Sequence, residues 1–146
     1  MTLSKADFSQ ISILVVDDSE FVRRLLKEML LCFGATKVYF AESAEQAFAR
    51  MEIQYPDLII CDWQMYPVDG LSVLRKLRLD TTSRLSRIPF IMLTGHNGAD
   101  DVSTAMGEGA DSYIVKPFSA GTLMNHLLKV ILADEEDADR QQSWAV

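Results

Sequence analysis

The residues best suited to chemistry follow four different short apolar runs of the chain. They are three carboxylates, one hydroxyl and one ammonium group, namely Asp17, Asp18, Asp62, Thr94 and Lys116. Three carboxylates brought together raise one another's pKa values, and a divalent cation removes that repulsion. An all-oxygen set of hard ligands suits Mg2+, which binds one or two carboxylates together with waters and phosphate oxygens. The residue types therefore predict a magnesium site able to support phosphoryl transfer, provided that the fold brings them together.

Within such a site, each residue type has a distinct use. Asp62 is placed to be the nucleophile, because carboxylates form aspartyl-phosphate intermediates. Mg2+ and the ammonium group of Lys116 would neutralise the oxygens of the moving group, and the Thr94 hydroxyl could donate a hydrogen bond to one of them. Taken singly, an Asp after a strand is usually a turn or cap residue, and Thr94 and Lys116 could be ordinary loop and surface residues. Their joint occurrence after separate strands favours the site.

The elements that must position these residues alternate regularly along the chain. Five apolar runs predict strands, at Ile11–Val16, Val38–Phe40, Leu58–Cys61, Phe90–Leu93 and Tyr113–Val115. The first, third and fourth suit strands buried on both faces, and the two shorter runs suit sheet edges. Five segments have helical periodicity, at about Val22–Leu30, Ser43–Met51, Leu71–Leu79, Asp101–Glu108 and Ala120–Ala133, with Gly34 as a stop and Ser43 with Gln46 as a capping box.

This alternation predicts an α/β protein with a (βα)5 chain and a doubly wound parallel sheet. In such sheets ligands bind beyond the carboxyl ends of the strands, where the special residues fall. We expect an N-terminal tail at 1–10, one domain at 11–133, and an acidic, disordered C-terminal tail at 134–146. The 146 residues are 49% hydrophobic, which is ample for one core.

Composition narrows the function classes. A net charge of −7 argues against nucleic acid as the main partner. No apolar run approaches the roughly 18 residues of a membrane span, and the N-terminus lacks the apolar core of a secretory signal. We expect Cys32 and Cys61 to be buried thiols in a reducing compartment. A basic stretch (Arg75, Lys76, Arg78, Arg84 and Arg87) is interpreted as a solvated helix face and loop, with a docking patch for an acidic protein as the alternative.

At its special residues the chain resembles the receiver domains of two-component response regulators, over about Ile11–Ala133. The motifs are ValValAspAspSer at Val15–Ser19, Asp62 with Asp69-Gly70 downstream, Thr94-Gly95, and LysProPhe at Lys116–Phe118. The resemblance implies a flavodoxin-like fold with strand order 2-1-3-4-5, as in the chemotaxis-type single-domain members. It also implies a cytoplasmic signalling protein that is not an enzyme, beyond catalysing its own phosphoryl transfer and dephosphorylation.

The resemblance also implies a role for each site residue. Asp17, Asp18, Asp62 and the backbone carbonyl of Gln64 would bind Mg2+. Asp62 would accept the phosphoryl group from a histidine kinase or a histidine phosphotransfer protein. Thr94 would then move toward the phosphoryl group, and Tyr113 would change its exposure, which reshapes a docking face for a downstream target protein. The family further implies a cis Lys116-Pro117 bond and a monomer, or a weak dimer that depends on phosphorylation.

The chain departs from the family pattern at one point, since Tyr66 lies between Met65 and Pro67, where proline usually follows the methionine directly. We expect a locally altered loop that keeps the phosphorylation. Gln64 and His96 occupy positions that influence how readily water attacks the phosphoryl group. His96 is otherwise interpreted as a loop residue, His126 as solvated or capped by neighbours, and Trp144 as inert or as an anchor for a partner.

Other interpretations stay open. The chain could be the receiver fragment of a larger regulator or hybrid kinase, with the acidic tail as a linker. A phosphatase of the haloacid dehalogenase type also combines an Asp nucleophile with Thr or Ser, Lys and Mg2+. In that class the nucleophile follows the first strand in an AspXaaAsp motif, whereas this chain has Asp17-Asp18. A flavodoxin-like redox domain would need a Ser/Thr-rich phosphate loop after the first strand, and none is present.

Overall fold

A single parallel sheet forms the centre of the protein. The computed structural model describes residues 7–95 and 98–144, with positions 135 and 137–144 described by their backbone alone. The strands are β1 (Ser12–Val16), β2 (Lys37–Ala41), β3 (Leu58–Asp62), β4 (Phe90–Thr94) and β5 (Ser112–Val115). All neighbouring pairs are parallel, and their order is β2-β1-β3-β4-β5. This confirms the predicted fold class and strand order.

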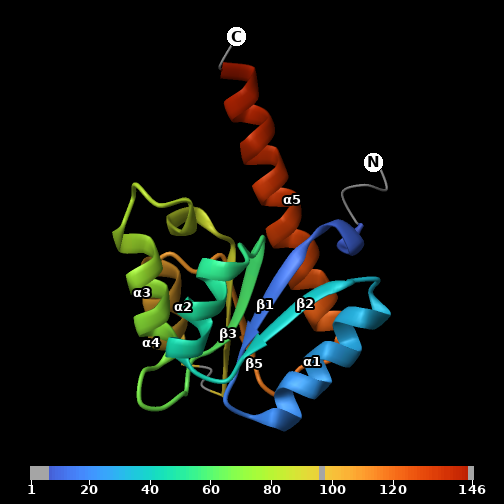
Figure 1. Cartoon of the computed structure of the whole chain (residues 1–146), viewed down its shortest axis with the longest axis vertical. Coiled ribbons are helices and arrows are strands. Elements are labelled where there is room, and N and C mark those ends of the chain that lie inside the picture. The colour runs from blue at the N-terminus through green and yellow to red at the C-terminus, as the bar shows by residue number, and fades with distance from the viewer. Residues whose placement is uncertain (1–6, 96–97, 145–146) are drawn as a thin grey trace.

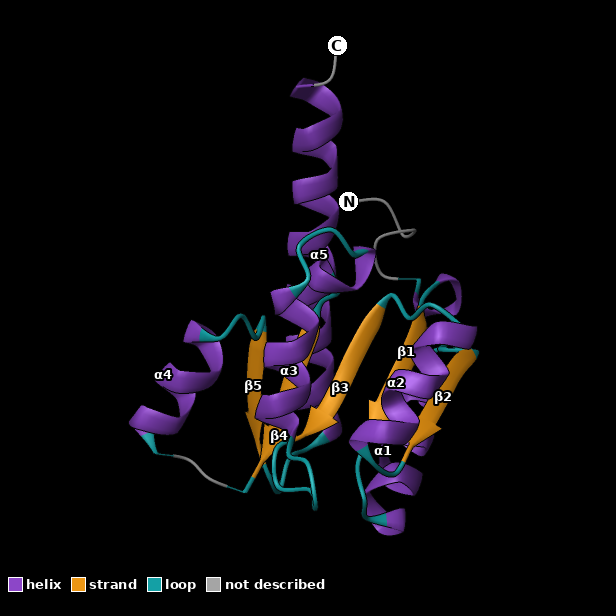
Figure 2. Cartoon of the chain, turned by 60° about the vertical axis from the view of Figure 1, so that its left-hand side comes forward, coloured by secondary structure: helices purple, strands orange, loops and turns teal. Residues whose placement is uncertain are grey.

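Helices cover both faces of the sheet (Figure 1; Figure 2). The helices are α1 (Glu20–Cys32), α2 (Ala44–Ile53), α3 (Gly70–Leu79), α4 (Ala99–Gly107) and α5 (Ala120–Trp144), with short 3-10 turns η2 (Phe8–Gln10) and η3 (Arg84–Arg87). Buried side chains of α2, α3 and α4 share one core cluster, and those of α1 and α5 share the other. The molecule is therefore a three-layer sandwich, with the sheet as its middle layer.

The two cores explain why the central strands have continuous apolar sequences. Successive side chains of a strand point to opposite faces, so Leu14 and Val16 enter the core beneath α2–α4. Ile13 and Val15 enter the core beneath α1 and α5. A strand covered on both sides has no solvent-facing position for a polar residue. In the edge strand β5, buried side chains alternate with half-buried ones, and most side chains of the edge strand β2 are half-buried. The shorter apolar runs of these two strands predict this lower burial.

Local side-chain caps begin the helices that follow the sheet's carboxyl edge. The Ser19 side chain accepts from the Val22 amide at the start of α1, and the Ser43 side chain accepts from the Gln46 amide at 3.1 Å at the start of α2. The Gln46 side chain accepts from the Glu42 amide at 2.7 Å, one residue before the usual capping-box partner. Gly34 has a φ of 99°, which a glycine adopts without strain, and it follows the end of α1 as predicted.

Helix α5 is longer than the sequence pattern indicates. The expected helix ends at Ala133 and is followed by a disordered acidic tail, but the helical backbone continues to Trp144. The expectation of disorder was wrong because acidic composition does not by itself oppose a helix. Glu, Ala, Gln and Arg make up most of 135–142, and all four have high helix propensity. In Figure 1 this segment extends beyond the end of the sheet at which the strands begin.

Two other expectations about the periphery need correction. Phe8, placed in the N-terminal tail, is buried in the core beneath α1 and α5, and its ring lies 6.1 Å from that of Phe33. Cys61 is buried as expected, but Cys32 is exposed, because it lies off the stripe of α1 that contains Leu26 and Leu30. Among the described residues, we find no helix with the length and apolarity that crossing a lipid bilayer demands.

Candidate metal and phosphoryl-transfer site

The three predicted carboxylates meet at one edge of the sheet. β1 and β3 are adjacent and parallel, so their carboxyl ends lie side by side. One carboxylate oxygen from each of Asp17, Asp18 and Asp62 lies within 4.8 Å of the others. Asp17 is fully buried, Asp62 is 3% exposed, and Asp18 faces solvent. Acids 45 residues apart in sequence are thus close enough to share one cation.

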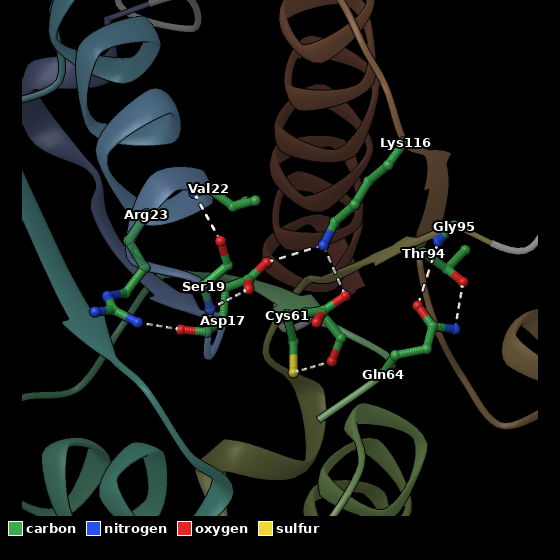
Figure 3. Close-up of polar contacts among 10 residues, drawn as sticks. Asp17, Ser19, Val22, Arg23, Cys61, Gln64, Thr94, Gly95 and Lys116 are labelled. Atoms are coloured by element: carbon green, nitrogen blue, oxygen red, sulfur yellow. Dashed lines mark hydrogen bonds and ion pairs between the residues drawn. The ribbon is translucent and has the colours of Figure 1, made fainter. Parts of the chain in front are cut away.

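Lys116 reaches the same point from the end of β5 (Figure 3). Its Nζ lies 3.1 Å from Asp17 Oδ2 and 2.9 Å from Asp62 Oδ1. Its backbone amide donates to the Thr94 carbonyl at 2.7 Å, which ties this residue to the end of β4. The Lys116-Pro117 bond is cis, as predicted, and the Tyr66-Pro67 bond is cis as well, which the sequence did not predict.

The charges at the site do not balance. Burial raises the pKa of Asp62, the hydrogen bond from Lys116 opposes this, and the charge of Asp17 adds to it. Burial disfavours the Lys116 ammonium, but the two carboxylates prevail and raise the pKa of Lys116. One ammonium group thus serves two buried carboxylates, with a third carboxylate at the rim. A hard divalent cation fits this set of oxygen donors, since it would supply the missing positive charge.

Thr94 is buried at the end of β4 and is held by Gln64. The Gln64 Nε2 donates to Thr94 Oγ1 at 2.7 Å, and the Gly95 amide donates to Gln64 Oε1 at 3.3 Å (Figure 3). Thr94 also makes a side-chain hydrogen bond with Tyr113. Tyr113 is half-buried, and its ring meets that of Trp63 edge-on at 6.3 Å between centroids. The contact between the Gln64 side chain and Thr94 could not be predicted from the sequence, which indicates only that the Gln64 position influences hydrolysis.

Two residues fix the backbone around Asp17: Ser19, which belongs to the predicted motif, and Arg23, which the sequence pattern did not indicate. The Ser19 amide donates to Asp17 Oδ1 at 2.9 Å, and the Arg23 Nη1 donates to the Asp17 carbonyl at 2.7 Å. Arg23 also lies 3.6 Å from Glu42, in the loop after β2. An arginine in the first turns of a helix resembles any surface residue in sequence, so no pattern distinguished Arg23.

Gly70 lets the loop after β3 return to the end of that strand, next to Asp62. A Cβ at this position would lie 2.2 Å from the Asp62 carbonyl oxygen, so no other residue fits without a shift of the backbone. The Gly70 amide donates to the Trp63 carbonyl at 2.9 Å, and Asp69 caps α3 by accepting from the Ser72 amide. The motif Asp69-Gly70 therefore positions the end of β3.

The basic stretch has one inward-facing residue, Arg78, and its other four members are exposed, as a solvated face predicts. Arg78 is largely buried and donates to the carbonyls of Gly109 and Ser86 and to the Asp111 carboxylate. Three other basic residues of the stretch also contact side chains of the protein. Arg75 pairs with Glu108, Lys76 lies over the Phe48 ring, and Arg84 lies over the Tyr55 ring. The interpretation as a solvated face was therefore wrong for Arg78, and these contacts do not favour a docking patch.

The remaining single residues have modest roles. His126 is half-buried and shares a hydrogen bond of 2.5 Å between its Nδ1 and the Ser112 hydroxyl, consistent with a residue held by its neighbours. Burial lowers the pKa of His126. His96 lies outside the described residues, and so does the side chain of Trp144.

The fold and this arrangement of residues define a receiver domain, and sequence comparison agrees. The family described as response regulator receiver domain matches residues 13–128, and the chain belongs to that family.

The matching relatives include chemotaxis proteins. The chain is 38% identical to the chemotaxis protein CheY1 of Helicobacter pylori over 120 residues, which cover 82% of this chain and 95% of that protein. It is 32% identical to the chemotaxis protein CheY of Pseudomonas aeruginosa, covering 81% and 94% of the two chains. Among solved structures, CheY4 of Vibrio cholerae is similar with a TM-score of 0.75 at 28% identity, over 82% of this chain and 98% of that one.

Proposed function

We propose that this receiver domain accepts a phosphoryl group on Asp62 and thereby changes a protein-binding face. The observation that carries the proposal is the convergence of the Asp17, Asp18 and Asp62 carboxylates, with the Lys116 ammonium bonded to Asp17 and Asp62. Phosphoryl transfer depends mainly on positioning and on preorganised positive charge, and this edge of the sheet offers both a nucleophile and a cation.

Magnesium fits the donor set as the cofactor. Asp17, Asp18 and Asp62 would hold it together with the backbone carbonyl of Gln64, and the ion would supply positive charge beside the transferred group. Asp17 and Asp62 are buried with one ammonium between them, so binding a divalent cation also relieves their repulsion.

In the transfer step, an Asp62 carboxylate oxygen attacks phosphorus. A new O–P bond forms, and the bond from phosphorus to the donor's imidazole nitrogen breaks, leaving the electron pair on that nitrogen. The donor is the phosphohistidine of a histidine kinase or a histidine phosphotransfer protein. Lys116 exchanges its contact with the Asp62 carboxylate for one with a phosphoryl oxygen, which keeps the new negative charge paired.

The new charge then biases a local switch. Thr94 moves to donate a hydrogen bond to the phosphoryl group, and Tyr113 follows because the two side chains are in contact. The face formed by β4, β5, α4 and α5 changes shape and binds or releases a downstream protein. We propose that the domain, at about 11–133, acts in the cytoplasm as a monomer or weak dimer, without direct nucleic-acid contact or enzymatic turnover of other substrates.

Replacing the acceptor tests the assignment. Asp62→Asn keeps the shape of the side chain and removes the nucleophile, so incubation with Mg2+ and acetyl phosphate leaves its intact mass unchanged while wild type gains one phosphoryl group. Asp80→Asn, at an exposed carboxylate in the loop after α3, is the matched control and gains mass like wild type. A phosphoryl adduct on Asp62→Asn at the wild-type level would show that the acceptor is another residue.

A further inference from the structure

The side chain of Gln64 joins the ends of two strands beside the acceptor. It comes from the loop after β3 and reaches the end of β4, where it contacts Thr94 and Gly95 (Figure 3). The Gly95 amide can only donate, so it must face the amide oxygen of Gln64. That fixes the Gln64 Nε2 toward Thr94, whose hydroxyl oxygen accepts at 2.7 Å. Both ends of the amide thus bond residues at the end of β4, one in the strand and one just after it.

These contacts hold the Thr94 side chain in a defined place. Thr94 Oγ1 is buried, accepts from Gln64 and shares a hydrogen bond with Tyr113. In the switch proposed above, the Thr94 side chain moves toward a phosphoryl oxygen on Asp62, and that movement of Oγ1 would stretch or break the bond from Gln64. The energy of the Gln64 contact therefore favours the unphosphorylated arrangement over the phosphorylated one.

We propose that the Gln64 side chain is a latch on Thr94, a positioning residue that sets how much of the protein occupies the switched state. This inference rests on the proposed function, because it concerns the same threonine and the same acceptor. In this proposal Gln64 has two separable parts: a backbone carbonyl, proposed above as a metal ligand, and a side chain that contacts Thr94. Any residue at this position keeps the first, and only a hydrogen-bonding side chain of suitable length keeps the second.

The size of the effect follows from one hydrogen bond between neutral groups. Removing a bond that exists in only one of two states shifts their ratio by roughly two- to tenfold. A ligand that binds the switched state gains apparent affinity by the same factor while that state remains the minor one. Beryllofluoride with Mg2+ is a suitable probe, because it occupies the acceptor as a phosphoryl group does.

Gln64→Met is the informative variant, because methionine keeps the length of the side chain and removes both amide contacts. Trp63 is next to Asp62, so its fluorescence serves to titrate Mg2+ first and then beryllofluoride. At a Mg2+ concentration that saturates each protein, we expect a roughly two- to tenfold gain in beryllofluoride affinity. Before any probe is added, the NMR shifts of Tyr113 should already be displaced toward their saturated positions. Gln10→Met, at an exposed residue whose side chain bonds only its neighbour Ser9 among the contacts described, is the control and resembles wild type.

A double variant shows whether the effect passes through the threonine. Thr94→Val removes the hydroxyl at nearly constant volume, so adding Gln64→Met to it produces no further gain in affinity. The proposed role of Gln64 is overturned if wild type binds beryllofluoride and Gln64→Met binds it equally well or more weakly. An equal gain in the Thr94→Val background overturns it too. Wild type that binds neither Mg2+ nor beryllofluoride overturns the proposed function itself.

Discussion

At the scale of single residues, the site is a balance between burial and charge. Asp17 and Asp62 lie beneath the surface and share Lys116, so each depends on the ammonium group and on any cation that joins them. Burial disfavours the ionised form of Asp62 and raises its pKa, and Lys116 only partly offsets that. The same imbalance that weakens the metal-free fold creates the affinity for a cation.

This imbalance predicts a dependence of stability on pH. Because the pKa of Asp62 is raised, the folded protein holds its proton more tightly than the unfolded chain does. Without Mg2+, the stability that protonated Asp62 contributes to the fold is fully present below 3.8, the pKa of the unfolded chain. This stability is lost as pH rises through the higher pKa of the folded protein. Lys116, with its pKa raised above 10.5, stays protonated throughout this range.

We therefore expect Asp62→Asn to become more stable relative to wild type as pH rises from 4 to 7 in chelator, measured by urea unfolding at each pH. Adding Mg2+ should stabilise wild type at pH 7 and reduce the difference. A difference in unfolding free energy that stays constant over this pH range would contradict the assigned origin of the shift.

The residue scale is also where sequence reasoning was least complete. The carboxylates and the ammonium group of the site were predictable, because metal-assisted phosphoryl transfer needs those residue types at the ends of strands. These residues are Asp17, Asp18, Asp62 and Lys116. Arg23 and the side-chain contacts of Gln64 were not, because their partners are a backbone carbonyl and a hydroxyl that become neighbours only after folding. No spacing along the chain encodes such a contact.

At the scale of elements, Arg78 joins three segments. It extends from α3 and donates to the Gly109 carbonyl at 2.9 and 3.1 Å, to the Ser86 carbonyl at 3.1 Å and to Asp111 at 3.2 Å. Asp111 also accepts from the Phe90 amide at the start of β4. Helix α3 is thereby fastened to η3 and to the turn that leads from α4 into β5.

We expect Arg78→Met to destabilise the fold by about 2–3 kcal/mol, because partly buried carbonyls and a carboxylate lose their donor. Chemical denaturation with Trp63 fluorescence measures this. Arg78→Lys should recover only part of the loss, since one ammonium cannot replace the planar fork. Arg24→Met removes an exposed pair with Glu20 and should cost less than about 0.5 kcal/mol. Similar losses for Arg78→Met and Arg24→Met would contradict the structural role.

Element boundaries were predictable to the extent that local patterns determine them. The strands of the sheet followed from their apolar runs, since residues covered on both faces have no polar alternative. Helix α2 followed from the cap at Ser43. The role of Arg78 did not follow, because a basic residue on a predicted helix has the same sequence signature whether it faces water or a carbonyl.

At the scale of the whole molecule, helix α5 divides into a packed part and an extension. Leu123, Leu127, Val130 and Ile131 belong to the core beneath α1 and α5, and Ile131 is the last buried side chain among those described. The backbone then continues as a helix for more than three turns, to Trp144. The extension has no apolar stripe, so a prediction from hydrophobic periodicity placed the end of the helix too early.

Truncation separates these two parts. Removing 137–146 should change the melting temperature by less than about 2 °C, because a helix end that leaves the domain adds little to its stability. Removing 130–146 also deletes Val130 and Ile131 and should cost at least about 3 kcal/mol. Thermal denaturation followed by circular dichroism tests both chains. A large loss from the shorter deletion would show that the extension packs on the domain.

The direction of α5 gives the molecule a convenient handle. The helix starts near the edge that carries Asp62 and runs back past the opposite end of the sheet (Figure 1). A dye, an affinity tag or a surface linker attached at the end of α5 is therefore held away from the edge that carries Asp62. Immobilised in this way, the protein would present its acidic edge to solution, so that a donor kinase and an output protein can be assayed on an oriented sensor surface.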